Sequence, residues 1–207
     1  MSNIISGNAT VTGNLKVAGT LSGHQRTDHD TETGSRFPIN LVDFRVFDAF
    51  QTNLPSAGAS DDLGLVGGTF ATGSPTIQTG DLKAAGSTTR YARAMVQVPM
   101  NYQDGESLAI VAYAGMLTTV ADTAATLDLE AFKVDGAGGI GSDLYAGSAI
   151  NVNSLTLADR SFALTPTGIV PGDLLDFRFA FLVNDGASGT AVNGCIGQVS
   201  LSCNTRG

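Results

Sequence analysis

The sequence predicts an all-β protein, with a short N-terminal trimeric shaft of β-helical or β-spiral type followed by an antiparallel, jelly-roll-like β-sandwich. Three observations predict it. A glycine-bearing unit of six residues repeats near the N-terminus, alternating apolar and polar residues run through most of the remainder, and clusters of Gly, Asn, Asp and Pro separate these runs. They divide the 207 residues into a shaft or docking segment at 1–23, a polar linker at 24–37 and a sandwich body at 38–207.

The repeat covers residues 5–22, which form three units of one pattern. An aliphatic residue opens each unit, glycine stands third, and a second apolar residue stands fifth. Glycine adopts positive φ without steric penalty, so a glycine at a fixed place in a short period is typical of extended chain that turns regularly. The apolar positions, which we expect to face an oligomer axis, are Ile5, Ala9, Val11, Leu15, Val17 and Leu21.

A stripe this short cannot cover its own apolar side chains, because solenoids need several stacked units. Other copies of the same chain are the simplest source of cover, and three chains winding about a common axis would bury the first and fifth positions of each unit. The repeat therefore predicts a homotrimer. The alternatives for this segment are an ordinary β-hairpin and a flexible glycine-rich tail.

The linker has no large apolar side chain between Gly23 and Arg36, and it carries both histidines of the protein. His24 and His29 lie close to Asp28, Asp30 and Glu32. On a trimer axis such a cluster could bind a metal ion threefold, but its spacing matches no known ligand pattern. We therefore expect a solvated tether and assign no metal.

The body alternates apolar and polar residues with period two, which predicts strands that bury one face. The clearest runs are 90–99, 108–114, 127–130 and 175–183. The turn clusters between them are 101–105, 135–139, 171–173 and 184–186. Eight to ten strands at this spacing predict a jelly-roll-like sandwich. Only residues 118–126 could form a short helix, and they could equally be a loop.

The two cysteines, Cys195 and Cys203, bracket a run whose alternation would place Cys195, Val199, Leu201 and Cys203 on one face. A continuous strand would hold the cysteines much farther apart than the roughly 6 Å between Cα atoms that a disulfide allows. We expect buried free thiols. No histidine lies near either cysteine in the sequence, so we do not expect a catalytic thiol.

Composition and charge narrow the choice of partners. Only 14% of residues are charged, there are 26 glycines, and tryptophan is absent; such a charge-poor surface suits a chain covered by its own copies or by a larger assembly. The net charge of −8 lies in the body and argues against nucleic-acid binding. The sequence has neither a membrane-length apolar run nor a signal peptide, so we expect no membrane partner and assembly in a cytosol.

Two motifs invite catalytic or metal-binding interpretations that we do not adopt. Gly136–Gly141 fits the dinucleotide pattern G-x-G-x-x-G, but no helix is predicted to follow and hold a pyrophosphate. Gly138–Asp143 fits the calcium unit G-G-x-G-x-D, which works in tandem and occurs here once. A Ser-His-Asp set would need a linker histidine. We expect no cofactor, no metal and no enzyme; paired carboxylates for glycoside hydrolysis are the open alternative.

The repeat also resembles a known group of proteins. Residues 11–21, Val-Thr-Gly-Asn-Leu-Lys-Val-Ala-Gly-Thr-Leu, resemble the V-T-G-N-L-x-V-x-G-T runs of fibre, spike and head-decoration proteins of tailed bacteriophages. The resemblance implies a homotrimeric virion protein without catalytic residues. We expect a capsid decoration protein, of cement or head-fibre type, that binds itself and the major capsid protein on the outer capsid surface.

The alternative is a short tail-fibre or receptor-binding protein that recognises a host glycan. The absence of tryptophan, a side chain often used to stack on sugars, argues modestly against it, although tyrosine can substitute. A carbohydrate-processing module is a third class, and it would require an acidic cleft.

Overall fold

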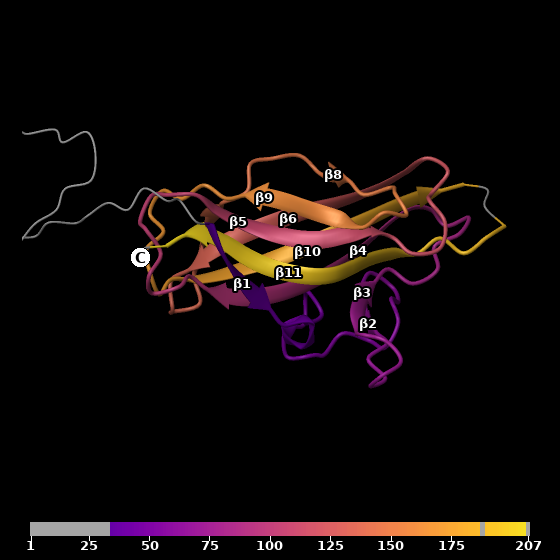
Figure 1. The fold of residues 1–207 in the computed structure, drawn as a ribbon, viewed down its shortest axis with the longest axis horizontal. Helices are drawn as coiled ribbons and strands as arrows, with labels where there is room; N and C mark the ends of the chain where they lie inside the picture. Colours follow the sequence, from indigo (N-terminus) through magenta and orange to yellow (C-terminus); the bar gives the residue numbers. More distant parts are fainter. Residues whose placement is uncertain (1–33, 187–188, 206–207) are drawn as a thin grey trace, which may run out of the picture. The chain divides into compact units, whose positions relative to one another are not determined.

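A computed structural model describes residues 34–186 and 189–205. They form two antiparallel sheets packed face to face (Figure 1), consistent with a jelly-roll-like sandwich. Within the described residues the one helical element is the 3-10 turn η1 (Leu41–Asp43), so the all-β class and the antiparallel sandwich are confirmed. The repeat lies outside the described residues, and the trimeric shaft stays a prediction.

Sheet A has six strands. Five neighbour one another in the order β2 (Gly64–Val66), β3 (Thr76–Gln78), β11 (Gly194–Asn204), β5 (Leu108–Met116) and β9 (Ala158–Ala163). The sixth strand, β1 (Gly34–Ile39), pairs with residues 199–204 of β11, on the edge opposite β5. Strands β1 and β3 thus share one edge of β11.

Sheet B has five strands, built around two long ladders. Its order is β4 (Gly86–Gln97), β10 (Leu174–Asp185), β6 (Ala124–Val134) and β7 (Ile140–Asp143), with β8 (Ile150–Asn151) also on β6. The ladder between β10 and β4 runs unbroken from Leu174 opposite Gln97 to Asp185 opposite Gly86. The short strands β7 and β8 form the edge of sheet B opposite β4, which limits edge-to-edge pairing between molecules there.

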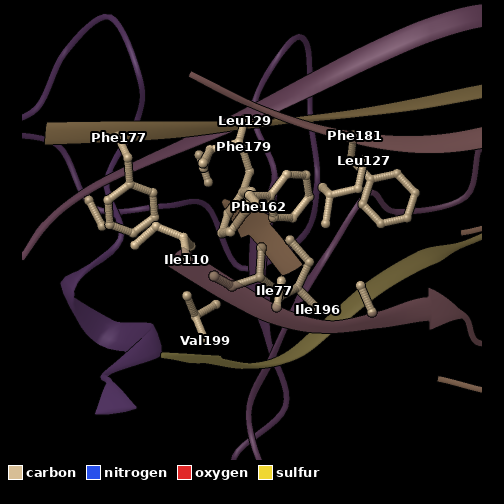
Figure 2. Close-up of a cluster of buried hydrophobic side chains, with 14 of the residues drawn as sticks. Ile77, Ile110, Leu127, Leu129, Phe162, Phe177, Phe179, Phe181, Ile196 and Val199 are labelled. Carbon is tan, nitrogen blue, oxygen red and sulfur yellow. The ribbon is translucent and has the colours of Figure 1, made fainter. Parts of the chain in front are cut away.

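The core lies between the sheets, where the period-two alternation brings the apolar side chains together. Figure 2 shows the rings of Phe177, Phe179 and Phe181 from β10 gathered with Ile110 of β5 and Ile196 of β11. Full burial of each such side chain stabilises the fold by roughly 2 kcal/mol. The inward positions predicted from the alternation and found buried are Ala92, Ala94, Val98, Leu108, Ile110, Ala112, Ala114, Leu127, Leu129, Leu175, Phe177, Phe179, Phe181 and Val183.

Strand β11 departs from the predicted alternation at a β-bulge. The register with β5 shifts between Ile196 and Gln198, so Ile196 joins the core and Cys195 points to the opposite side. The prediction for Cys195 is therefore wrong, and it is right for Val199, Leu201 and Cys203. An extra residue in one strand reverses the faces of everything before it.

Both cysteines are buried and free, as predicted. Cys195 lies opposite Gln78 in the ladder between β11 and β3. Burial raises the pKa of both thiols above the usual range. A buried thiol with a raised pKa is unreactive at neutral pH.

Two boundaries differ from the predictions. Strand β1 begins at Gly34, inside the predicted linker 24–37, because Gly34–Phe37 pair with residues 201–204 of β11. The polar composition of this stretch hides a pairing that only the distant strand creates. Residues 118–123 form a loop instead of the possible helix, and β6 begins directly after it.

The segment 40–63 encloses the outer edge of β4. Arg45 exchanges two backbone hydrogen bonds with Arg93 of that strand (2.8 and 3.1 Å). Phe44 enters the core beside Phe177, at 5.7 Å between ring centroids, whereas Phe47 contacts Tyr91 on the outer face of sheet B at 4.6 Å. The aromatic side chains of the segment 40–63 therefore pack beside β4 on both the core side and the outer side of sheet B.

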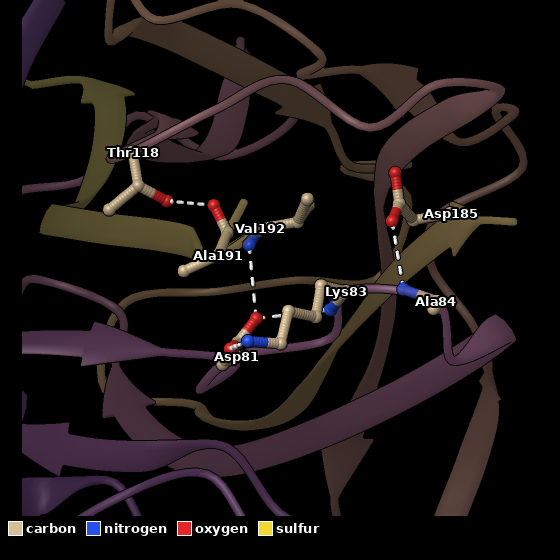
Figure 3. Close-up of polar contacts among 7 residues, drawn as sticks. All are labelled: Asp81, Lys83, Ala84, Thr118, Asp185, Ala191 and Val192. Atoms are coloured by element: carbon tan, nitrogen blue, oxygen red, sulfur yellow. Dashed lines mark hydrogen bonds and ion pairs between the residues drawn. The ribbon is translucent and has the colours of Figure 1, made fainter. Parts of the chain in front are cut away.

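The end of the sandwich near Gly86 and Asp185 is held together by carboxylates and backbone amides. Figure 3 shows Asp81 accepting hydrogen bonds from the backbone N–H groups of Lys83 and Val192, and Asp185 accepting one from Ala84. These N–H groups favour the ionised carboxylate and lower the pKa of Asp81. The carboxylates at this end are structural.

Candidate functional site

A groove of about 370 Å³ crosses the outer face of sheet A. We call it groove A. Its floor includes Ser200 of β11 and Val111 of β5, one wall is residues 38–41, and Tyr113 lies on the other side. Ligand pockets commonly measure about 300–1,000 Å³, so groove A has the size of a small-molecule site.

Tyr113 supplies an aromatic surface in groove A. It points outward from β5, in register with Gln198 of β11 and Asp159 of β9, and it is 40% exposed. Its ring comes close to the bulge: a Cβ atom at Gly197 would lie 3.7 Å from the Tyr113 Cδ1 atom. The ring is thus supported along one edge by the glycine of the bulge and remains open to solvent elsewhere.

An ion pair spans groove A. The Arg36 guanidinium lies 2.7 Å from the Asp159 carboxylate. Arg36 belongs to β1 and Asp159 to β9, so the pair bridges over the two intervening strands, β11 and β5. The side chains remain 53% and 47% exposed. Because these are the charged residues that line groove A, its formal charges cancel.

Neutral polar groups complete the lining. Asn40 precedes η1, Gln198 follows the bulge, and both side chains are exposed. Each amide can donate and accept hydrogen bonds, and the Ser200 hydroxyl can do both as well. Groove A therefore offers donors, acceptors and one aromatic ring on a rigid sheet face.

The outer face of sheet B presents a different arrangement. Arg93 of β4 makes a bidentate ion pair with Asp176 of β10, and Arg178 pairs with Glu130 of β6. The hydrogen bond to Asp176 raises the pKa of Arg93, and Asp176 is only 5% exposed. This polar network is satisfied internally.

Aromatic rings from the segment 40–63 and from β4 flank those arginines. The Arg178 guanidinium lies 4.6 Å from the centroid of Tyr91 and 5.2 Å from that of Phe47. The Arg93 guanidinium lies 5.0 Å from the centroid of the Phe50 ring. Each such cation–π contact contributes about 0.5–1 kcal/mol when partly exposed. We assign a structural role to this face.

The predicted site residues of the shaft, Ile5, Ala9, Val11, Leu15, Val17 and Leu21, lie outside the described residues. The linker histidines His24 and His29 lie outside them too. Across residues 34–186 and 189–205, no three His, Cys, Asp or Glu side chains gather to hold a metal ion. In the same ranges, no helix has the length and apolarity to cross a bilayer.

The G-x-G-x-x-G and G-G-x-G-x-D matches lie on the hairpin between β6 and β7. Strand β7 begins at Ile140, inside the stretch Gly136–Gly141, where a dinucleotide site would need the start of a helix. The carboxylate of Asp143 accepts hydrogen bonds from the backbone N–H groups of Ala131 and Tyr145, both at 3.0 Å. The acidic residue of the calcium-like unit thus fastens the β7 turn to β6.

Sequence reasoning did not find groove A. Arg36 fell within the predicted linker, and Asp159 and Gln198 carry no motif. These residues come from separate strands and meet only through the order of sheet A. The one available signal was Tyr113, a large aromatic residue at an outward position of the alternating run 108–114.

No family model matches the chain, and no curated protein matches it. Among solved structures, TmCBM61 in complex with β-1,4-galactotriose is similar with a TM-score of 0.37 and 11% identity, covering 70% of this chain and 84% of that one. The CBM22-1 xylan-binding domain of Paenibacillus barcinonensis Xyn10C has a TM-score of 0.36 and 14% identity, covering 79% and 94%.

Tailspike protein 4 of bacteriophage CBA120, in its enzymatically active domain, is similar over 70% of this chain and 18% of its own, with a TM-score of 0.34 and 12% identity. At these identities and TM-scores the likenesses concern the β-rich fold alone. They say nothing of what this chain binds.

Proposed function

We propose that this chain is a non-catalytic structural protein of a tailed-bacteriophage virion, a trimeric decoration protein of cement or head-fibre type on the outer capsid surface. Its partners are two further copies of itself and the major capsid protein, and it assembles in the host cytoplasm. The hexad repeat of residues 5–22 is the observation that carries this proposal.

The way the body begins supports it. The described chain starts at Gly34, which pairs with Asn204 at the end of β11, and Asn204 accepts a backbone hydrogen bond from Gln103. The repeat-bearing segment therefore connects covalently to the body at this end of the sandwich.

The same end carries exposed apolar side chains. Met100 is 75% exposed and lies against Gly172. Two further exposed apolar residues flank Gly172 in the sequence: Val170 in the turn before β10, and Leu174 at the start of β10. Apolar side chains gathered on a surface often mark a contact with another chain. In the proposed assembly these side chains are candidates for contact with another copy or with the capsid.

Comparing particles with and without this protein tests the proposal. Decoration uses many weak contacts repeated over symmetry-related sites, so the chain should bind assembled shells far more tightly than isolated coat protein. Particles that lack it should lose resistance to heat or low salt. Particles that keep this resistance but lose adsorption to host cells would replace decoration with receptor binding.

Receptor binding is the second candidate function, and groove A favours it. An open groove of ligand size on a rigid sheet suits recognition of a molecule outside the virion. The adsorption measurement above separates the two candidates.

A further inference from the structure

We propose that groove A binds a short neutral saccharide, with Tyr113 as its stacking platform and Arg36, Asp159 and Gln198 as its hydrogen-bonding groups. The inference rests on the second candidate function, because a saccharide on a host surface is the ligand that such a receptor site would recognise. It requires neither a particular virion location nor a trimer.

The aromatic ring indicates the shape of the ligand. A pyranose presents C–H groups on one face and hydroxyls around its edge, so an exposed ring with polar neighbours complements it. The Tyr113 ring and the Leu157 side chain both lie beside Gly197, so one edge of the ring packs along the bulge. A tyrosine fixed in this way gives contact area at little cost in conformational entropy.

The polar groups indicate hydroxyls. A sugar hydroxyl donates one hydrogen bond and accepts others, and groove A supplies both kinds of partner side by side: guanidinium N–H groups from Arg36, carboxylate oxygens from Asp159 and an amide from Gln198. Hydrogen bonds to charged groups are about twice as strong as neutral ones. The side chains of Arg36 and Asp159 each remain about half exposed, so a ligand can reach both of them.

The charge balance favours a neutral ligand. The charges of Arg36 and Asp159 cancel, so no cation is left unpaired in groove A to hold a phosphate, sulfate or sialic acid. The net charge of −8 on the chain adds a repulsive field for anions. A peptide would need deeper apolar pockets, whereas Val111 on the floor is only 4% exposed.

A glycan array tests the proposal with the labelled full-length chain, using neutral and sialylated glycans as probes. Titration calorimetry with the strongest neutral trisaccharide or tetrasaccharide then gives the affinity. We expect Tyr113→Ala to weaken binding at least tenfold, Asp159→Asn to weaken it several-fold, and Tyr113→Phe to preserve it.

Phe70→Ala is the matched control, because Phe70 is a 97% exposed aromatic residue on the β2–β3 loop, away from groove A. It should bind as the wild type does. Thermal unfolding of each variant confirms that the sandwich is intact. The proposal is overturned if no neutral glycan binds, if only sialylated glycans bind, or if Tyr113→Ala and Phe70→Ala have equal affinities.

The outcomes for groove A and for the receptor function can be told apart. If the purified chain binds neutral glycans through Tyr113 while particles lacking the protein still adsorb to host cells, the saccharide site stands and the receptor function fails. If adsorption requires the protein but no neutral glycan binds, the receptor function stands and the saccharide site fails.

Discussion

The two outer faces of the sandwich carry similar residue types and use them in opposite ways. On sheet B, Arg93 and Arg178 are paired with carboxylates and covered by Phe47, Phe50 and Tyr91. On sheet A, one arginine and one carboxylate meet across an open groove beside an exposed tyrosine. Aromatic, cationic and anionic side chains thus stabilise the fold on the face of sheet B, whereas on the face of sheet A they remain available to bind a ligand.

The difference follows from the segment 40–63. Its backbone bonds to the edge of β4, which bounds sheet B, and that attachment brings its aromatic residues over sheet B. On sheet A, residues 38–41, which lead into η1, border groove A without covering it. The strands beneath the two faces have similar alternation, so the connection that covers a face decides its role.

Breaking an ion pair should give the largest difference in stability between the two faces. Arg93→Met leaves the nearly buried Asp176 carboxylate without its partner, and we expect it to lower the free energy of unfolding by about 2 kcal/mol, less than for a fully buried pair because Arg93 is 31% exposed. Arg36→Met breaks a pair exposed on both sides and should cost at most about 0.5 kcal/mol. Urea unfolding measures both.

A double variant sharpens this prediction. Replacing both partners, as in Arg93→Met with Asp176→Leu, should recover much of the loss, because no uncompensated charge then remains. Equal costs for Arg93→Met and Arg36→Met would show that the two faces do not differ in the way the exposures indicate.

The aromatic residues give the next contrast. Phe47→Ala removes a ring that contacts Tyr91 and the Arg178 guanidinium, and it should destabilise the fold by about 1–2 kcal/mol. Tyr113→Ala removes a ring that is 40% exposed and packs along the bulge, so it should destabilise the fold by less than Phe47→Ala does, at most about 1 kcal/mol. Thermal unfolding at one pH compares them. A larger loss for Tyr113→Ala would make its role structural.

The inward faces of the long strands could be predicted from the sequence because burial imposes its period on each strand separately. The runs containing Ala92, Ile110, Leu129 and Phe179 needed no knowledge of their neighbours to be assigned. Cys195 could not be placed, because a single extra residue at the bulge reverses the alternation and glycine at 197 gives no distinct signal.

Groove A could not be predicted for a related reason. Arg36 and Asp159 are far apart in the sequence and meet only because β1 and β9 flank the same two strands. In the same way, residues 44–50 cover sheet B only because their backbone hydrogen-bonds to the edge strand β4, which lies far along the sequence. Pair contacts across a sheet are set by strand order, which local periodicity does not contain.

The smallest expected effect lies at Asp62, in the segment that covers sheet B. Its Oδ1 atom is buried without a hydrogen-bond partner, and burial, together with repulsion from Asp61 and Asp48, raises its pKa above the usual 3.8. The folded state therefore holds the proton more tightly than the unfolded state does. Stability falls as pH rises from about 3.8 through the raised pKa, and the full cost is present at neutral pH.

Asp62→Asn should remove this cost and raise the free energy of unfolding at pH 7 by a few tenths of a kcal/mol to about 1 kcal/mol. The gain should shrink as pH falls toward the unfolded-state pKa of about 3.8, because the wild-type carboxyl is then increasingly protonated in both states. Asp61→Asn is the matched control: Asp61 is exposed, so relief of its repulsion alone should give a smaller gain. Urea unfolding of both variants from pH 3.5 to pH 8 measures the difference. A pH-independent effect would mean that the covering segment tolerates this charge without cost, and that sheet B is covered less tightly than its aromatic contacts indicate.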